Sequence, residues 1–405
     1  MAPMMKPVAI TAWQCQSVAG GGNAALLNAL RENRCLLAPP EFISLPFPTV
    51  VGEAPDPMPA ITPALKDFDC RNARYALAAL EANGFRSVIA NARERYGVSR
   101  VGVVMGTSTS GIYDSEQAYM HFVRYGRMPE DFNFLRRHAV QATAEYLQKE
   151  LALEGPCYAV STACSSSAKA LGSAQRMIQT GVCDAALVAG VDTLCRLTLR
   201  GFHALDLVSP DPCRPMDAER CGINIGEGSA MLLLEKASHG NRDFPHLLAV
   251  GESSDAHHMS TPDPEGTGAE AAMRQSLAMA NIAPESIDYV NLHATATRLN
   301  DLAEAKAIHR LFGDRVPCSG IKGLLGHTLG ASGAVEVVAT LVSMLAGFLP
   351  GTYGLETPDP EVKLQLLSKP EKNDRVAFAL CNAFGFGGSN ASVLLAHSGM
   401  ALEFP

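Results

Sequence analysis

One pattern of residues occurs twice along this chain. Short apolar or β-branched runs, which are expected to be buried strands, alternate with longer helical stretches, as is typical of α/β packing. The runs lie at residues 101–106, 157–162 and 184–191, and the scheme recurs at 289–295, 316–320 and 376–396. The chain is therefore predicted to contain two similar halves, residues 1–245 and 246–405.

Two helical segments carry the repeat most clearly. They are CSSSAKALGSAQRMIQTG at 164–181 and GHTLGASGAVEVVATLVSML at 326–345, and both begin with small residues and hold few charges. Such helices are expected where a helix is packed on both faces and its backbone must approach its neighbours closely. We predict a layered α/β/α/β/α fold with these helices in the central layer and no flexible linker between the halves. Two independent α/β domains are the alternative.

Composition narrows the class of protein. Apolar residues make up 47% of the 405 residues and charged residues 18%, which indicates a compact globular chain. Residues 1–16 lack an apolar signal core and are predicted to form a first strand. The longest apolar window, 337–349, is interrupted by polar residues and falls short of the ~20 residues of a membrane span, so we expect a buried helix there. The net charge of −8 argues against nucleic acid as the main partner.

The cysteines favour a reducing compartment. There are eleven, an odd number, and none forms a C-x-x-C pair. This pattern argues against structural zinc and against a disulfide framework, so we expect no metal and a cytoplasmic location. Most of these thiols should be small core residues, and one is a candidate for chemistry.

Cys164 is that candidate. A β-type run ends at Ser161, and Cys164 then opens a helix of small residues. A thiol at a helix N-terminus faces the positive end of the dipole and free N–H groups, which are expected to lower its pKa. Such a thiolate is a nucleophile at neutral pH.

Two histidines and a glycine-rich turn complete the pattern. His293 and His327 lie in turns rich in small residues, where an imidazole N–H can stabilise an enolate or an oxyanion. In NAFGFGGSN (382–390) the glycines allow a tight turn whose N–H groups suit an oxyanion hole. The turn fits neither the dinucleotide nor the phosphate-binding glycine pattern. No cofactor is therefore expected.

Four motifs now stand together: TACSSS around Cys164, HATATRLND from His293, KGLLGHTLGASGAVE from Lys322 and NAFGFGGSN from Asn382. In this order they resemble elongating β-ketoacyl-[acyl-carrier-protein] synthases, condensing enzymes of the thiolase fold. The resemblance covers about residues 95–396. It implies an acyltransferase that joins malonyl and acyl groups by decarboxylative Claisen chemistry, in fatty acid, aryl polyene or polyketide-type biosynthesis.

The resemblance assigns the central roles. Cys164 matches the acyl-accepting nucleophile, and His293 and His327 match the histidines that act on the malonyl thioester. Lys322 and Glu336 match a buried charged pair beside His327. The lysine should favour neutral imidazole, and the carboxylate should offset the cost of burying the ammonium.

Further roles follow from the same match. Thr295 and Thr297 match hydroxyls that bind the pantetheine arm, and Asp301 matches a structural acid. Phe384 matches a gating aromatic, and the backbone N–H groups of Phe386 and of the nucleophile match the oxyanion hole. Asn382 and Glu227 are expected to hold the fold together.

Several positions depart from the family pattern. Ala294 and Ala296 replace glycines, Ser165 replaces an alanine, and TSTSG at 107–111 replaces a more glycine-rich segment that reaches a dimer interface in the family. The two methyl groups beside His293 are expected to narrow or redirect the pantetheine tunnel. These departures favour a specialised synthase of the aryl polyene or polyketide-like type.

The resemblance also implies partners: acyl- and malonyl-loaded acyl carrier protein, and a second subunit in a homodimer or in a heterodimer with a chain-length-factor-like chain. Carrier proteins are acidic, so basic residues should gather at the tunnel mouth. The candidates are Lys66, Arg71, Arg74, Arg124 and Arg127.

Four other functions were weighed. Thiolases and initiating synthases that use coenzyme A thioesters lack a histidine at the position of His327, which disfavours both. A serine hydrolase at 106–110 lacks the second glycine of its motif. A non-catalytic, chain-length-determining subunit remains an alternative that acylation of Cys164 would exclude.

Overall fold

The computed structural model describes residues 5–55 and 58–399. Strands of the first half pair in the order β4-β3-β5-β6-β1, and those of the second half in the order β9-β8-β13-β14-β7. The first-half strands are β1 (Val8–Ser17), β3 (Val101–Gly106), β4 (Cys157–Val160), β5 (Ala185–Asp192) and β6 (Gly228–Lys236). Their counterparts are β7 (His246–Ser254), β8 (Tyr289–Asn291), β9 (Pro317–Ser319), β13 (Phe378–Gly385) and β14 (Ser389–Ala396).

The repeat extends to strand direction. In the first half β4, β3 and β5 run parallel to one another, and in the second half β9, β8 and β13 do so. The pairs β5–β6, β6–β1, β13–β14 and β14–β7 are antiparallel. Val8 pairs with Leu247, and this contact between β1 and β7 joins the two half-sheets. The short strands are β2 (Gly20–Gly21), β10 (Phe348–Leu349), β11 (Gln365–Leu366) and β12 (Glu371–Lys372). The expected similarity of the two halves is confirmed, whereas the exact division at residue 245 stays a prediction.

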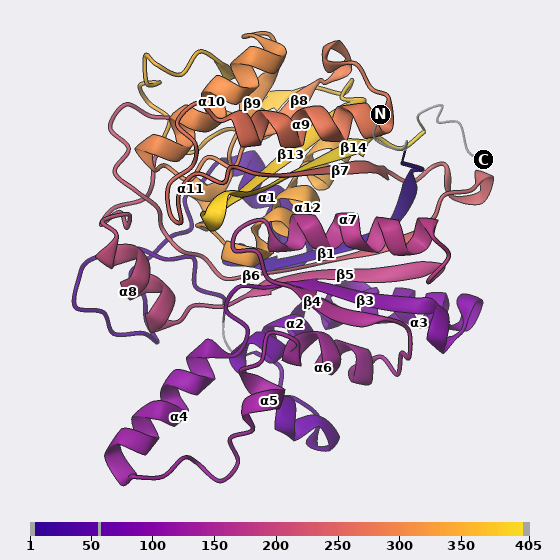
Figure 1. Cartoon of the computed structure of the whole chain (residues 1–405), viewed down its shortest axis with the longest axis vertical. Helices are drawn as coiled ribbons and strands as arrows, with labels where there is room; N and C mark the ends of the chain where they lie inside the picture. Colours follow the sequence, from indigo (N-terminus) through magenta and orange to yellow (C-terminus); the bar gives the residue numbers. More distant parts are fainter. Residues whose placement is uncertain (1–4, 56–57, 400–405) are drawn as a thin grey trace.

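Helices form three layers around these half-sheets (Figure 1). The central layer holds α7 (Ser166–Gln179) and α12 (Ser332–Leu345), which contact each other and strands of both half-sheets. The outer layer on the first half contains α2 (Arg71–Glu81), α3 (Phe85–Tyr96) and α6 (Ala142–Glu150). The outer layer on the second half contains α9 (Thr267–Ala280) and α10 (Arg298–Phe312). The layered α/β/α/β/α prediction is confirmed, and the alternative of two independent domains is wrong because α7 and α12 pack on both halves.

The remaining helices are α1 (Asn23–Glu32), α4 (Ile112–Tyr125), α5 (Phe134–Arg137), α8 (Arg196–Ala204) and α11 (Lys322–Leu325). The predicted first strand corresponds to β1, while residues 1–4 lie outside the described part of the chain. The window 337–349 is the buried end of α12 followed by a turn and β10. Within residues 5–55 and 58–399, no helix is both long and apolar enough to cross a bilayer.

Small residues set the spacing of the central layer. A Cβ atom at Gly333 of α12 would lie 2.8 Å from both the Cβ and the backbone nitrogen of Ala168 in α7. At Gly190 of β5 a Cβ would lie 2.8 Å from the Cβ of Ala334. Atoms this close cannot be accommodated without movement of a helix or strand. The small residues of both repeated segments therefore permit the two helices to share one layer.

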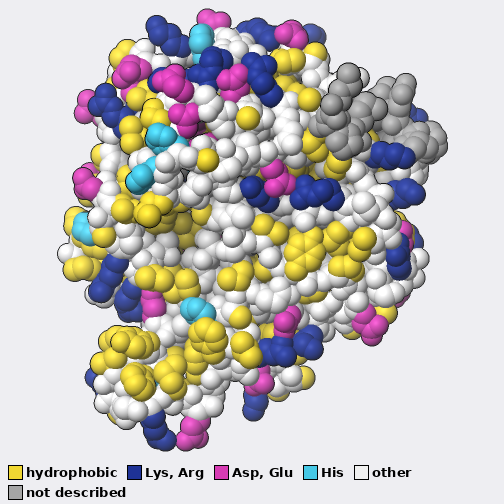
Figure 2. Space-filling model, in the orientation of Figure 1, with side chains coloured by type: hydrophobic (Ala, Val, Ile, Leu, Met, Phe, Trp, Pro, Cys, Tyr) yellow, Lys and Arg dark blue, Asp and Glu magenta, His cyan; other side chains and the backbone are white. Residues whose placement is uncertain are grey.

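A segment stands apart from these layers. We call residues 112–137, which contain α4 and α5, the arm; it projects from the body at the lower left of Figure 1. Apolar side chains gather on its surface (Figure 2). Those of Tyr119, Met120, Phe122, Val123 and Tyr125 in α4 are exposed. Of the described residues of α4, Ala118 is buried.

Packing in the central layer gives a test of this architecture. We expect Gly333→Ala to lower the free energy of unfolding by about 1–3 kcal/mol, because the added methyl group overpacks the α7–α12 contact. The matched control is Gly201→Ala in α8, where a Cβ meets nothing within 4 Å. That change should stabilise the helix by up to about 1 kcal/mol. Thermal unfolding of both variants makes the comparison, and equal midpoints would contradict this account.

Candidate active site

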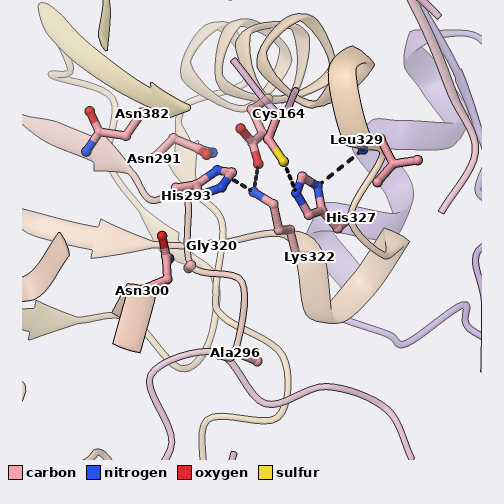
Figure 3. Close-up of polar contacts among 12 residues, drawn as sticks. Cys164, Asn291, His293, Ala296, Asn300, Gly320, Lys322, His327, Leu329 and Asn382 are labelled. Atoms are coloured by element: carbon pink, nitrogen blue, oxygen red, sulfur yellow. Dashed lines mark hydrogen bonds and ion pairs between the residues drawn. The ribbon is translucent and has the colours of Figure 1, made fainter. Parts of the chain in front are cut away.

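Cys164 lies between the central helix and the strand that precedes it. The chain leaves β4, passes Ala163 at a φ of 51°, and starts α7 two residues after Cys164. The residue is 5% exposed. Its sulfur lies 3.0 Å from Nε2 of His327. Figure 3 shows Cys164, His293, His327 and Lys322 pointing toward one another.

The hydrogen bond to Nδ1 of His327 decides which ring nitrogen carries the proton. The backbone N–H of Leu329 donates to Nδ1 at 3.2 Å, so in the neutral ring the proton is on Nε2, which faces Cys164. Burial, and then the charge of Lys322, hold the pKa of His327 well below its usual value. The ring is therefore a neutral N–H donor to the centre of the site.

His293 is held in the same state. Burial, then the charge of Lys322 and then His327 hold its pKa well below the usual value. Its Nδ1 lies 3.4 Å from Nζ of Lys322, which in turn forms an ion pair with Glu336 in α12. Both charged residues are 1% exposed. The predicted buried pair is present, and its effect on the imidazoles agrees with the sequence analysis.

The expected pKa of Cys164 was wrong. Burial raises the pKa of the thiol to about 12, while Lys322 and the backbone N–H of Phe386 act in the opposite direction. The helix begins at Ser166, so the thiol precedes the first turn of the helix and lies in a dry site where a thiolate is costly. The resting thiol is neutral at pH 7.

The glycine-rich turn lies against the nucleophile. At Gly385 a Cβ atom would lie 2.8 Å from the carbonyl oxygen of Thr162 and 3.2 Å from the backbone nitrogen of Cys164. Glycine is required there because the two backbones approach so closely. The N–H of the next residue, Phe386, points to the Cys164 sulfur. The ring of Phe384 lies 5.9 Å from that of His293.

A pocket of about 280 Å³ ends at Cys164 and both histidines. Thr295 and Thr297 line it, and their hydroxyl oxygens lie 2.9 Å apart. Phe384 and Phe386 line the same pocket. The structure therefore brings the predicted pantetheine-binding, gate and oxyanion residues to one cavity with the nucleophile.

Lys322 and two further predicted site residues do not line this cavity. Glu336 is paired with Lys322, and Asp301 in α10 is fully buried. Asp301 accepts hydrogen bonds from the backbone N–H groups of Met216 at 2.9 Å and Ala296 at 3.2 Å. Both residues support the site without lining the pocket.

The sequence analysis missed Glu304. This fully buried carboxylate accepts hydrogen bonds from the backbone N–H groups of His293 and Ala294, each at 2.8 Å, and from the amide of Asn382 at 3.2 Å. Burial raises its pKa to about 7. Its place three residues after Asp301, on the same face of the expected helix, was a signal that could have identified it.

The departures from the family pattern have a different effect from the one expected. Ala294 and Ala296 have φ values of 35° and 63°, both are fully buried, and neither lines the pocket. A Cβ atom at Gly320 would lie 2.6 Å from the methyl group of Ala294, so this methyl group packs against Gly320. The expectation that these methyl groups narrow the tunnel is therefore wrong, since they point into the protein behind it.

The predicted basic patch needs correction at one residue. The guanidinium of Arg71 binds the buried carboxylate of Glu227 at 2.6 Å, so this arginine belongs to a structural ion pair. None of the other four candidates, Lys66, Arg74, Arg124 and Arg127, lines the pocket. Arg220 and Arg298 do, and Arg298 is exposed. Their contribution to carrier binding stays a prediction.

Donor atoms at the centre of the site also have the character of metal ligands. The ligand atoms of Cys164, His293 and His327 lie within 4.8 Å of one another. The ammonium of Lys322, 3.4 Å from Nδ1 of His293, opposes a bound cation by charge repulsion. The arrangement fits N–H donation to a thioester better than it fits metal binding.

Comparison with known proteins agrees with this geometry. The family model for the N-terminal domain of β-ketoacyl synthases matches residues 5–240, and the model for the C-terminal domain matches residues 246–356. A 3-oxoacyl-[acyl-carrier-protein] synthase 2 of Vibrio harveyi is 32% identical over 362 residues, which cover 82% of this chain and 86% of the relative. Nodulation protein E of Rhizobium meliloti is 35% identical over 300 residues, 72% of this chain and 74% of that protein.

Solved structures give the same assignment. A chain in the complex of the ketosynthase ApeO with its chain length factor ApeC from Xenorhabdus doucetiae superposes with a TM-score of 0.89 at 35% identity, covering 97% of this chain and 98% of that one. The ishigamide ketosynthase/chain length factor also gives 0.89, at 26% identity, covering 98% of this chain and 100% of that one. The chain therefore belongs to the β-ketoacyl synthase family, acyltransferases with the thiolase-type fold.

Proposed function

We propose that this protein extends an acyl group held on Cys164 with a two-carbon unit from malonyl-loaded acyl carrier protein. The observation that carries the proposal is the position of two neutral imidazoles around a buried thiol at the end of one pocket. Cys164, His293, His327 and Lys322 are the proposed catalytic residues. The first half of the chain supplies Cys164, and the second half supplies the other three residues.

Acyl transfer comes first. The Cys164 sulfur forms a bond to the acyl carbon, the carbon–sulfur bond to the carrier breaks, and the thiol proton ends on the departing pantetheine sulfur. The backbone N–H groups of Cys164 and Phe386 are suited to stabilise the oxyanion of the tetrahedral intermediate. Because the thiol proton is transferred to the leaving group in this step, the resting Cys164 thiol can be neutral.

Condensation follows after a malonyl-loaded carrier enters. The bond to the malonyl carboxylate breaks, carbon dioxide leaves, and N–H groups of His293 and His327 stabilise the enolate oxygen. The enolate carbon then attacks the acyl carbonyl, the Cys164 carbon–sulfur bond breaks, and β-ketoacyl carrier protein is released. The sulfur leaves as a thiolate and takes up a proton from solvent, which restores the neutral thiol. Because each half-reaction uses a different loaded carrier at one site, ping-pong kinetics are expected.

The pocket supports the proposed substrate. Thr295, Thr297 and Phe384 line the pocket. We propose that the two hydroxyls hydrogen-bond a pantetheine amide and that Phe384, whose ring lies 5.9 Å from that of His293, controls access to the site. Asp301 and Glu336 act by holding the loop and the lysine. The reaction transfers no electrons and needs no Lewis acid, so we propose that it uses no cofactor beyond the carrier-bound phosphopantetheine.

For the pathway, we propose specialised aryl polyene or polyketide-type biosynthesis rather than housekeeping fatty acid elongation. The support is the likeness to ketosynthases solved with chain length factors, together with the departure from the family pattern at residues 107–111. We also propose a cytoplasmic location, in keeping with eleven free cysteines.

We propose that the arm binds a second subunit. Its exposed apolar side chains form a surface of the kind that marks protein interfaces. The four residues of the edge strand β4, which leads to Cys164, are all half-buried. A second copy of this chain or a chain-length-factor-like subunit would cover both. The structures that resemble this chain include complexes of the second kind.

Acylation of Cys164 is the decisive test of the function. We expect a mass increase equal to one acyl group when the enzyme is mixed with acyl carrier proteins, and no increase for Cys164→Ala. Cys221→Ala is the matched control, because this exposed thiol lines the same pocket. Intact-protein mass spectrometry measures the adduct and identifies the preferred acyl chain. Absence of an adduct with every donor, alone and with a partner subunit, would favour a non-catalytic role.

The pH dependence of decarboxylation tests the imidazoles. Since the pKa values of His293 and His327 lie well below 6.5, both rings stay neutral, and the rate of malonyl-carrier decarboxylation should not fall between about pH 8 and pH 6. Lys322→Met removes a charge that lowers both pKa values, so its acid limb should move to higher pH. Lys236→Met, at an exposed position, is the control. A wild-type rate that is half-maximal near pH 6.5 would contradict neutral donors.

Assembly tests the arm. We expect the double change Tyr119→Glu, Val123→Glu to dissociate the assembly, because two charges would be buried in an apolar interface. Val182→Glu, at an exposed apolar residue outside the arm, should leave it intact. Sedimentation velocity measures the mass, with and without a chain-length-factor-like partner. An arm variant that sediments like the wild type would exclude the arm as an interface, and a wild type that dimerises only with the partner would identify a heterodimer.

A further inference from the structure

A second buried cluster lies next to the active site. Asp192 ends β5, is fully buried, and accepts hydrogen bonds from the unusual segment 107–111. Three groups donate to Oδ1 of Asp192: the hydroxyl of Thr107 at 2.7 Å, the backbone N–H of Thr109 at 2.8 Å and the hydroxyl of Thr109 at 2.6 Å. The hydroxyl of Ser108 lies 2.9 Å from Oδ2. These groups stabilise the carboxylate without an opposing charge among the contacts described.

The same carboxylate reaches the loop that carries His327. The backbone N–H of Gly330 donates to Oδ2 of Asp192 at 2.5 Å. The preceding N–H, that of Leu329, is the one that donates to Nδ1 of His327. A Cβ at Gly330 would lie 2.7 Å from Oδ2, so this residue must be glycine for the contact to form.

The loop needs such an anchor because its backbone is strained. Leu329 has a φ of 54°, a left-handed conformation that costs a residue with a side chain roughly 1–2 kcal/mol. Released from Asp192, Leu329 would be free to leave the left-handed region, and the change in its φ would turn the peptide between Thr328 and Leu329, which carries the Leu329 N–H. The Leu329 N–H would then no longer face Nδ1, and nothing would hold the His327 proton on Nε2.

We propose that Asp192 is a positioning residue for His327, which fixes the imidazole tautomer through the Gly330 and Leu329 backbone. The inference rests on the proposed function, because the Nε2–H is the group that acts on the thioester. Asparagine cannot replace the carboxylate. With its oxygen kept by the hydroxyl of Thr107 and by the hydroxyl and backbone N–H of Thr109, its amide N–H₂ would face the Gly330 N–H, and two donors repel each other.

Two substitutions separate this role from general support of the fold. Asp192→Asn removes the acceptor for Gly330, whereas Thr107→Val removes one donor to the other oxygen and leaves the Gly330 contact in place. We expect Asp192→Asn to lower kcat for malonyl-carrier decarboxylation about 10- to 100-fold, as when an oxyanion donor is displaced. KM should change by less than about twofold, since substrate binding is untouched. Thr107→Val should keep a kcat near that of the wild type.

The tautomer itself is measured by ¹⁵N-histidine NMR of the intact enzyme. In the wild type and in Thr107→Val the His327 signals should show a protonated Nε2, and in Asp192→Asn a mixture of tautomers. An unchanged tautomer in Asp192→Asn, or an equal loss of kcat in Thr107→Val, would overturn the proposal. If the wild type itself fails to decarboxylate, the proposed function fails, while the NMR comparison still decides the role of Asp192.

A second variant covers the case in which Asp192→Asn does not fold. The hydroxyl of Ser108 also accepts from the Gly330 N–H, at 3.2 Å, while it donates to Asp192. Ser108→Ala keeps the carboxylate and weakens the anchor. A smaller loss of kcat with partial mixing of tautomers would support the proposal, and full retention of both would refute it.

Discussion

The active site depends on the ion pair between Lys322 and Glu336. Both side chains are enclosed in the central layer, where an unpaired charge would destabilise the fold by several kcal/mol. The pair makes it possible to keep an ammonium 3.4 Å from His293, and that positive charge reinforces the effect of burial on both imidazoles. Two neutral N–H donors can therefore face a reacting thioester without becoming cations. Removing either partner would disturb the chemistry and the packing of α12 together.

The duplication explains how these groups meet. β4 and β9 occupy equivalent places in the two half-sheets, and each is followed by a loop and by a central helix, α7 or α12. The loop after β4 supplies Cys164, and the segment between β9 and α12 supplies Lys322, at the start of α11, and His327. Because α7 and α12 pack side by side, the equivalent loops lie together, and the sulfur and Nε2 come within 3.0 Å. The site is thus a consequence of the pseudo-symmetric central layer, with His293 added from the segment that follows the neighbouring strand β8.

Sequence patterns were sufficient for the features that depend on local order. The layered fold followed from two similar helices, and the nucleophile, histidines and charged pair lay in contiguous motifs. The pKa of Cys164 could not be predicted, because its enclosure depends on Gly385, more than two hundred residues away in the chain. Asp192 was missed because its partners, at residues 107–109 and 330, lie far from it in the chain, and Glu304 was missed because its spacing from Asp301 was not used. The arm was missed because its apolar side chains are exposed and do not pack into this chain's own core.

Strain around the site suggests why three buried carboxylates surround it. Residues with left-handed backbone stand beside the nucleophile and both histidines: Ala163, Ala294, Ala296 and Leu329. Each conformation costs free energy, and such costs persist only where the surroundings hold the chain in place. Glu304 binds the N–H groups of residues 293 and 294, Asp301 binds that of residue 296, and Asp192 binds that of residue 330. A carboxylate is well suited to this task, because it accepts several hydrogen bonds and offers no competing donor. These backbone groups are therefore held by buried carboxyl groups that do not line the pocket.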